Sequence, residues 1–137
     1  MERTDFDVAV VDGGLAGTAA ALAFVQQGCS VRLYERRDLA RDPNRGDILH
    51  APTVEIVRRL GILGLLEKRG ASRWHGLRIV YSQGRFSAES EIPEPWLLNH
   101  AEMEAAFLDA AGEQGADVRN EVVRSLDRGG DESAPTW

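Results

Sequence analysis

The sequence predicts an α/β fold built on a parallel sheet, and three consecutive segments lead to this prediction. An apolar, β-branched stretch, Phe6 to Val11, has the composition of a strand that is buried on both faces of a sheet. The alanine-rich segment 15–27 predicts a helix that ends at Gly28. A second strand is predicted over Ser30 to Tyr34. A strand, a helix and a strand in succession form a βαβ unit, whose two strands run parallel.

The middle of the chain predicts a loop, two helices and a hairpin. The polar segment 36–47 is expected to be a loop. Pro52 lies in the first turn of a predicted helix that ends at Gly61, and a short amphipathic piece follows over 62–70. A hairpin is predicted over 77–88, turning at Gln83 and Gly84.

The last predicted elements are a helix and a strand. Pro93 and Pro95 indicate a loop, and Asn99, with Glu102 three residues later, has the pattern of a capping box at a helix start. Segment 116–126 predicts one more strand, or two short ones. We therefore expect a domain over 1–126 and a disordered tail over 127–137.

Composition limits the function classes. A chain of 137 residues is long enough for one domain, and its net charge of −6 argues against binding to nucleic-acid backbones. The single cysteine, Cys29, leaves no internal disulfide and is typical of a reducing compartment. Asp12 interrupts the apolar segment 8–25, and the residues before it are mostly acidic, unlike a signal peptide. We expect a cytoplasmic protein that does not span a membrane.

The turn after the first strand carries a glycine pattern that is typical of dinucleotide sites. Gly14 would let the backbone approach a pyrophosphate, and Gly17 would let the helix pack closely on the sheet. The helix N-terminus would offer free N–H groups to the phosphates. Glu35, at the end of the second strand, could accept both ribose hydroxyls, which favours FAD or NAD over NADP. The alternative is a glycine cluster that serves helix packing and binds no ligand.

Three segments resemble FAD-dependent monooxygenases of the aromatic-hydroxylase type. "DVAVVDGGLAGTAAALAFVQQGCSVRLYERR" resembles the N-terminus of that family, and "RGDILHAPTVEIVRRLGILG" resembles the segment that follows it. "LLNHAEMEAAFLDAAGEQGADVR" resembles the later helix and third parallel strand. The three occur in the family's order and cover the chain to about Leu126.

The resemblance implies a Rossmann-like FAD/NAD(P)-binding half-domain with an appended hairpin. The reaction of the family is hydroxylation of an organic substrate by oxygen, with FAD reduced by NAD(P)H. The resemblance places Arg45 near the flavin pyrophosphate and His100 at a position that usually contacts the cofactor. Together with the motif, it gives these expected cofactor-binding residues: Gly13, Gly14, Leu15, Ala16, Gly17, Glu35, Arg36, Arg45 and His100. We expect no catalytic residue and no metal ligand within the chain.

Asp12 occupies the first glycine position of the pattern. A left-handed backbone conformation there would cost an aspartate about 1–2 kcal/mol. A carboxylate about 4 Å from a phosphate charge would cost up to ~4 kcal/mol at an effective dielectric constant of about 20. If Asp12 points to solvent, the cost is smaller. Both outcomes remain open from the sequence.

The chain is also shorter than the enzymes that it resembles. We expect an N-terminal portion that does not hydroxylate a substrate alone and that associates through its exposed apolar surface. A rival interpretation is a cofactor-free remnant of the fold, acting at most as an interaction module. A compact NAD-binding protein is a third alternative, but the sequence offers no residue set for hydride transfer.

Overall fold

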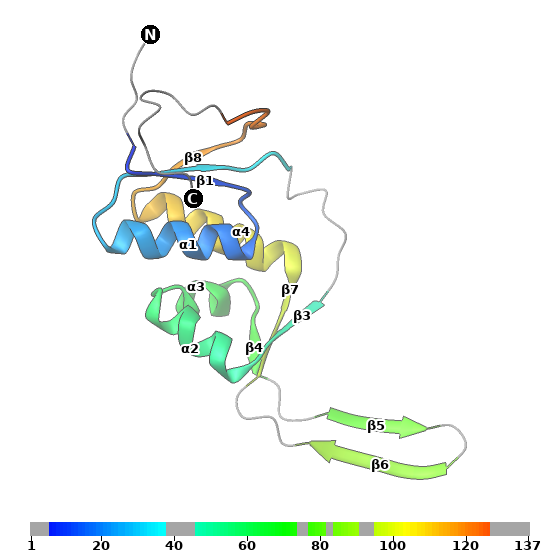
Figure 1. Ribbon diagram of the computed structural model, residues 1–137. Helices are drawn as coiled ribbons and strands as arrows, with labels where there is room; N and C mark the ends of the chain where they lie inside the picture. The colour runs from blue at the N-terminus through cyan, green and yellow to red at the C-terminus, as the bar shows by residue number, and fades with distance from the viewer. Residues whose placement is uncertain (1–5, 38–45, 74–76, 82–83, 91–94, 127–137) are drawn as a thin grey trace, which may run out of the picture.

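The parallel sheet is present in the computed structural model, which describes residues 6–37, 46–73, 77–81, 84–90 and 95–126 (Figure 1). Three parallel strands, β1 (Val8–Val11), β2 (Val31–Tyr34) and β8 (Asp117–Arg119), lie in the order β1-β2-β8. The predicted α/β class with a parallel sheet is therefore confirmed.

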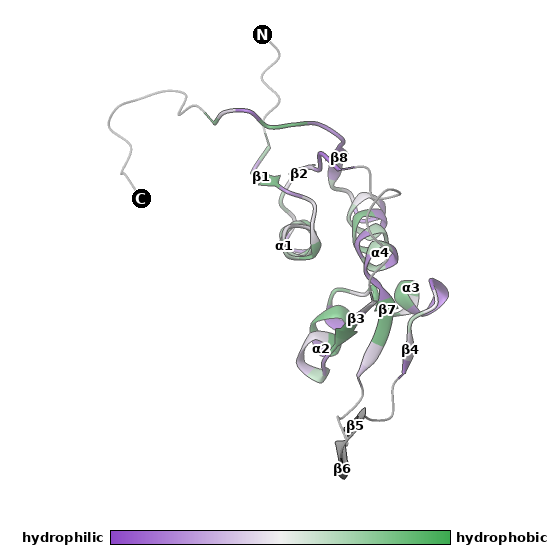
Figure 2. Ribbon diagram, turned by 90° about the vertical axis from the view of Figure 1, so that its right-hand side faces the viewer, coloured by the Kyte–Doolittle hydropathy of each residue, from purple (hydrophilic) through white to green (hydrophobic). Residues whose placement is uncertain are grey.

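Two long helices cover one face of this sheet. Helices α1 (Leu15–Gln26) and α4 (His100–Glu113) lie side by side beneath the strands in Figures 1 and 2. Strand β2 alternates buried and half-buried residues, because its even and odd side chains point to opposite faces of the sheet. No helix among the described residues lies on the opposite face, where Val11 keeps 47% of its surface exposed.

The core lies between the sheet and the helices and continues below them. Ala21 and Leu22 of α1 pack with Leu33 of β2 and with Ala106 and Phe107 of α4. The small alanines let α1 and α4 approach closely, and the larger side chains fill the remaining space. Fully burying one leucine contributes about 1.5–3 kcal/mol to stability. Helix α4 packs against α1 and β8 on one side and against α3 and β7 on the other, so it joins the two sheets' parts of the core.

A second, antiparallel sheet was not predicted. Its strands β3 (Gly46–Leu49), β7 (Trp96–Asn99) and β4 (Ser72–Arg73) lie in the order β3-β7-β4. Helices α2 (Ala51–Arg59) and α3 (Leu63–Lys68) connect β3 to β4.

The loop predicted over 36–47 is therefore wrong at its end, because Gly46 and Asp47 belong to β3. Gly46 pairs with Asn99 in β7, so the strand depends on a partner more than 50 residues away. Local composition carries no signal of such pairing. The loop predicted around Pro95 is likewise shorter than expected, since β7 begins at the next residue.

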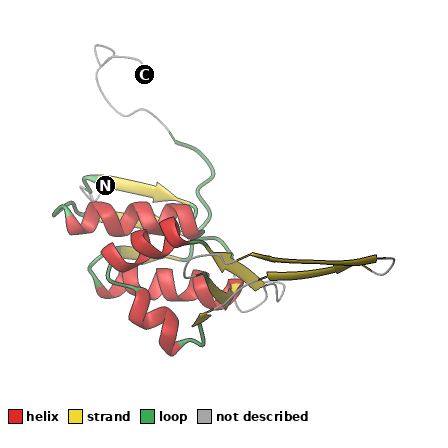
Figure 3. Ribbon diagram, turned by 90° about the horizontal axis from the view of Figure 1, so that it is seen from below, coloured by secondary structure: helices red, strands yellow, loops and turns green. Residues whose placement is uncertain are grey.

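The predicted hairpin is confirmed. Strands β5 (Leu77–Tyr81) and β6 (Gly84–Ser90) pair antiparallel, and the hairpin projects away from the helices in Figures 1 and 3. Strand β6 extends two residues beyond the predicted limit, Ala88.

The predicted cap of α4 is also present. The side chain of Asn99 accepts hydrogen bonds from the backbone N–H groups of Ala101 (2.9 Å) and Glu102 (3.4 Å). The strand predicted over 116–126 is shorter than expected, since β8 ends at Arg119. The tail predicted over 127–137 lies outside the described residues. Within the described part of the chain, no helix is long and apolar enough to span a membrane.

Candidate functional site

Two glycines where β1 leads into α1 have no room for a side chain: Gly13 in the turn and Gly17 in the first turn of the helix. A Cβ atom on Gly17 would lie 1.9 Å from the backbone oxygen of Asp12, which is a backbone clash. A Cβ on Gly13 would lie 2.8 Å from the Cβ of Glu35. Gly14 is more open, since the atoms nearest to its Cβ position are 3.6 Å away. Gly14 therefore lies in the more open position, while Gly13 and Gly17 permit close packing.

The N-terminus of α1 follows directly from this turn. Gly14 is the N-cap residue, and no acidic side chain lies in the first turn of the helix. The hydroxyl of the buried Thr18 lies within hydrogen-bond distance of the backbone oxygens of Gly13 (2.8 Å) and Gly14 (2.9 Å), and its one proton can be donated to either. The first N–H groups of a helix have no partner within the helix and attract anions. Leu15 and Ala16, both predicted site residues, supply two of these groups.

Glu35 lies beside the same turn, as the sequence pattern predicts. It follows β2, only 3% of its surface is exposed, and its Oε2 lies 3.0 Å from the Cβ position of Gly13. Its Oε1 accepts from the backbone N–H (2.7 Å) and Nε (3.2 Å) of Arg37, and its Oε2 from Nη2 (3.0 Å). Burial raises the pKa of Glu35, but the bonds from Arg37 outweigh it and the pKa lies below its ordinary value. The carboxylate is therefore ionised at neutral pH.

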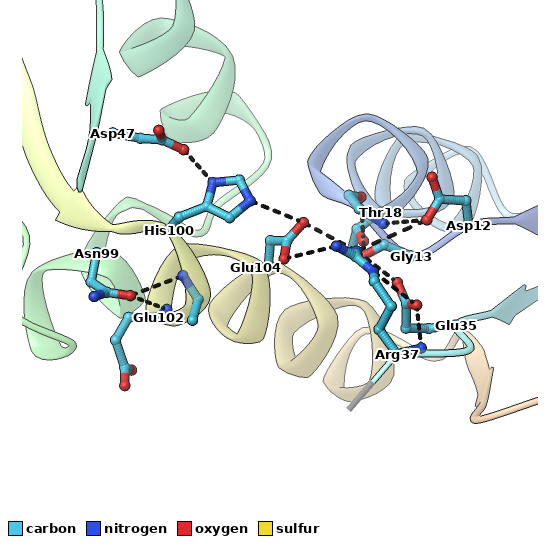
Figure 4. A network of polar contacts seen from close by, with 12 residues as sticks. Asp12, Gly13, Thr18, Glu35, Arg37, Asp47, Asn99, His100, Glu102 and Glu104 are labelled. Carbon is cyan, nitrogen blue, oxygen red and sulfur yellow. Dashed lines mark hydrogen bonds and ion pairs between the residues drawn. The ribbon is translucent and has the colours of Figure 1, made fainter. Parts of the chain in front are cut away.

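Arg37 joins three acidic side chains (Figure 4). Besides Glu35, its Nη2 contacts Oε1 of Glu104 at 3.1 Å and lies 3.9 Å from Oδ1 of Asp12. The hydrogen bond to Glu35 is the main cause that raises the pKa of Arg37, and burial opposes it. Glu104, on α4, is 3% exposed. Sequence reasoning missed both Arg37 and Glu104. The pair of arginines after Glu35 was a signal for the first.

Asp12 adopts the left-handed conformation that a glycine would adopt without strain. Its φ is +88°, and it is the one non-glycine residue with positive φ in the described ranges. Its Oδ1 accepts a long hydrogen bond (3.4 Å) from the backbone N–H of Gly14, while the side chain remains 76% exposed. The expected backbone cost is therefore confirmed, and of the two positions considered for the carboxylate the structure shows the solvent-facing one, for which the smaller cost was expected. The backbone is strained, and the carboxylate faces solvent at the mouth of α1.

His100 connects the site to the antiparallel sheet. Its Nδ1 contacts Oδ2 of Asp47 on β3, and its Nε2 lies 3.3 Å from Oε1 of Glu104, one helical turn further along α4. The His100 side chain is 8% exposed. Figure 4 shows the resulting series of contacts from Asp47 to Arg37. His100 thus reaches the site through Glu104.

A cleft of about 520 Å³ opens at the carboxyl ends of β1 and β2. Its lining residues come from the turn, the end of β2, α4 and the segment after β8: Val11, Asp12, Gly14, Tyr34, Arg36, Arg37, Glu104, Glu121, Val122 and Val123. This volume is typical of small-molecule sites, and ligands of α/β sheets bind at the carboxyl ends of strands. Among the predicted site residues, Gly14 and Arg36 line the cleft. Arg45 lies outside the described residues.

The residues present fit an adenine dinucleotide. Gly17 permits the tight turn, Gly14 leaves space at the helix N-terminus, and Glu35 is ionised beside it. In the part of the chain that the structure describes, no group of histidine, cysteine, aspartate or glutamate residues could hold a metal ion.

Residues 5–136 match the family described as FAD binding domain. The chain belongs to this family. FAD is therefore its cofactor, as the sequence resemblance implied.

The named relatives of the chain include monooxygenases. The chain is 28% identical to 3-amino-4-hydroxybenzoate 2-monooxygenase PtmB3 of Streptomyces platensis, over 74% of this chain and 28% of that protein. It is 27% identical to the FAD-dependent monooxygenase OpS4 of Beauveria bassiana, over 93% of this chain and 33% of that protein. The chain thus spans about a third of the length of these relatives.

The fold of this FAD binding domain also matches solved structures. The flavin-dependent brominase Bmp2 superposes with a TM-score of 0.77 at 21% identity, over 90% of this chain and 31% of the brominase. 2-Methyl-3-hydroxypyridine-5-carboxylic acid oxygenase superposes with a TM-score of 0.71 at 22% identity, over 82% of this chain and 30% of that one. The shared part is the parallel α/β unit with its smaller antiparallel sheet.

Proposed function

We propose that this chain is the FAD-binding part of a flavoprotein monooxygenase and that it holds the adenosine diphosphate half of FAD in the cleft at the N-terminus of α1. The observation that carries this proposal is the position of Glu35. A buried, ionised carboxylate lies against Gly13, at the mouth of a helix whose first N–H groups are free to bind an anion.

Glu35 lies against Gly13, next to the cleft but not among its lining residues. The groups in and beside the cleft have distinct roles in this proposal. The N–H groups at the start of α1, from Gly14 to Gly17, bind the pyrophosphate. Glu35 accepts a hydrogen bond from the adenosine ribose, and Arg36 contributes positive charge to the cleft wall. Arg45 and His100 keep the cofactor-contacting roles that the family resemblance implies.

Glu35 has limited capacity for a ribose. A carboxylate has about four lone-pair positions, and hydrogen bonds from Arg37 already take three of them. Glu35 can therefore hold one ribose hydroxyl while Arg37 stays in place, and both hydroxyls only if Arg37 moves.

The activity proposed for the whole protein is hydroxylation of an organic, often aromatic, substrate with NAD(P)H and oxygen. The chemistry that FAD supplies when bound is two-electron redox and activation of oxygen. The residues of this chain bind and orient the cofactor, and we assign none of them a catalytic role. The monooxygenase names of PtmB3 and OpS4 support this reaction class.

A cofactor-free interaction module is the second candidate, and one observation favours it. Oδ1 of Asp12 already accepts from the N–H of Gly14, and Arg37 already binds Glu35, so these groups of the site are paired without a ligand. FAD must compete with both contacts.

The test is a titration of the purified chain with FAD, followed by flavin fluorescence. We expect Glu35→Gln to weaken FAD binding about 10–100-fold, because a hydrogen bond to a charged group contributes about 1.5–3 kcal/mol. Glu55→Gln is the control, since Glu55 is also a glutamate paired with arginine, here with Arg58 and Arg59, but on the distant helix α2.

Equal FAD affinity in the Glu35 and Glu55 variants would contradict the assigned ribose contact. No FAD binding by the native chain or by Asp12→Gly would favour the interaction module.

We also propose a cytoplasmic location, self-association through the open face of the sheet, and no nucleic-acid partner. The partly buried single cysteine, Cys29, the exposed Val11 and the net charge of −6 support these three points.

A further inference from the structure

An internal carboxylate competes with the ligand at the N-terminus of α1. Oδ1 of Asp12 lies 3.4 Å from the N–H of Gly14, the residue that caps the helix. A negative charge at this end of a helix is favourable, so Asp12 takes the place of an anion. A pyrophosphate that binds there must displace this contact and then remain close to the carboxylate.

Arg37 stands beside both groups. Its Nη2 lies 3.9 Å from Oδ1 of Asp12 and 3.6 Å from the Cβ position of Gly14. Two buried carboxylates, Glu35 and Glu104, hold the same nitrogen at 3.0 and 3.1 Å. The guanidinium is therefore fixed in position, next to the strained residue and at the edge of the expected pyrophosphate site.

We propose that Arg37 is a positioning residue that compensates for Asp12, so that a dianionic pyrophosphate can bind at the N-terminus of α1 despite the aspartate in the first position of the glycine pattern. This inference rests on the proposed function, because it assigns the pyrophosphate of FAD to this cleft. The two buried glutamates hold Arg37, and Arg37 in turn offsets the charge of Asp12.

The compensation is expected to act on binding more than on folding. Without ligand, Asp12 is 76% exposed and water screens its attraction to Arg37, so the pair contributes little to stability. A bound dinucleotide excludes water from the cleft, and the interactions among Asp12, Arg37 and the phosphates become stronger. If Arg37 had only a structural role, its coupling to Asp12 would appear in the free energy of unfolding and not in the affinity for the ligand.

The test is a double-mutant cycle with Asp12→Asn, Arg37→Gln and the combined variant. Asparagine tolerates positive φ as aspartate does, so Asp12→Asn removes the charge and keeps the backbone. FAD affinity is measured by flavin fluorescence, ADP and adenosine affinity by calorimetry, and the free energy of unfolding by urea. ADP carries the pyrophosphate, whereas adenosine does not.

We expect Arg37→Gln to weaken FAD and ADP binding at least fivefold more when Asp12 is present than in Asp12→Asn. We also expect Asp12→Asn alone to tighten ADP binding and to leave adenosine binding unchanged. The urea data should show no comparable coupling between the two positions.

The inference would be overturned if Arg37→Gln lowered FAD affinity by the same factor, within twofold, with Asp12 present and in Asp12→Asn. The proposed function would then remain intact. Failure of every variant to bind FAD or ADP would overturn both. If Arg37→Gln does not fold, the same cycle is run in a Glu104→Gln background. That background lacks one of the two buried carboxylates that lose their partner when Arg37 is replaced. The same criteria apply.

Discussion

At the scale of single residues, the site concentrates negative charge around one guanidinium. Glu35 and Glu104 are both 3% exposed, and Arg37 binds both. A buried ion pair contributes little net stability compared with apolar packing, but removal of one partner costs about 3–5 kcal/mol because a charge is left buried. Arg37 is therefore required by the fold as well as proposed for the ligand.

The lowered pKa of Glu35 predicts a dependence of stability on acid. Because the folded state holds the carboxylate ionised, the unfolded state binds more protons at low pH. The contribution of Glu35 is therefore complete above the ordinary glutamate pKa of about 4.3, and it is lost as the pH falls through the lower folded-state value.

Urea unfolding of the native chain and of Glu35→Gln from pH 7 to pH 3 measures this loss. We expect the stability difference between them to shrink below about pH 4.3. A difference that stays constant over this range would show that Glu35 does not titrate as argued.

Gly17 gives a residue-scale prediction that is independent of charge. Gly17→Ala places a methyl group 1.9 Å from the backbone oxygen of Asp12, so we expect a loss of stability at or beyond the upper end of about 1–3 kcal/mol. Gly64→Ala on α3 is the control, because its Cβ has open space and alanine favours a helix by up to ~1 kcal/mol. Thermal unfolding of both variants is the measurement. Similar melting temperatures would contradict the close approach.

At the scale of elements, the region N-terminal to Tyr34 could be predicted and the antiparallel sheet could not. The strand, glycine turn, helix and second strand are adjacent in sequence, so each local pattern was sufficient. Strands β3 and β7 form because Gly46 to Leu49 pair with Trp96 to Asn99, a long-range contact that no local window contains. The positions of Arg37 and Glu104 were missed for the same reason, since one follows β2 and the other lies on α4.

Helix α1 depends on its contact with α4, and this gives an element-scale prediction. The side chain of Leu22 on α1 is fully buried in the core. Leu22→Ala should therefore lower the free energy of unfolding by about 2–5 kcal/mol. Ile56→Ala on α2, where the side chain is 54% exposed, should cost less than 1 kcal/mol, roughly. Urea denaturation compares the two. A loss at Ile56 as large as at Leu22 would contradict the assigned core.

At the scale of the whole molecule, the chain corresponds to about a third of the relatives that it matches. One face of the parallel sheet is covered by α1 and α4, while on the other face Val11 is largely exposed, as is Val122 in the segment that follows β8. The family, the cofactor and the parallel sheet could be predicted from the motifs alone. The polar contacts at the cleft depend on Arg37 and Glu104, which only the three-dimensional arrangement brings together.

The contacts from Asp47 through His100 to Glu104 join the site to the antiparallel sheet. Should a bound phosphate attract the guanidinium of Arg37, Glu104 would keep His100 as a neighbour at 3.3 Å, and His100 in turn is held by Asp47 on the other sheet. Glu104, which lines the cleft, is therefore joined to β3 through the imidazole of His100, so a displacement of this carboxylate would reach the antiparallel sheet.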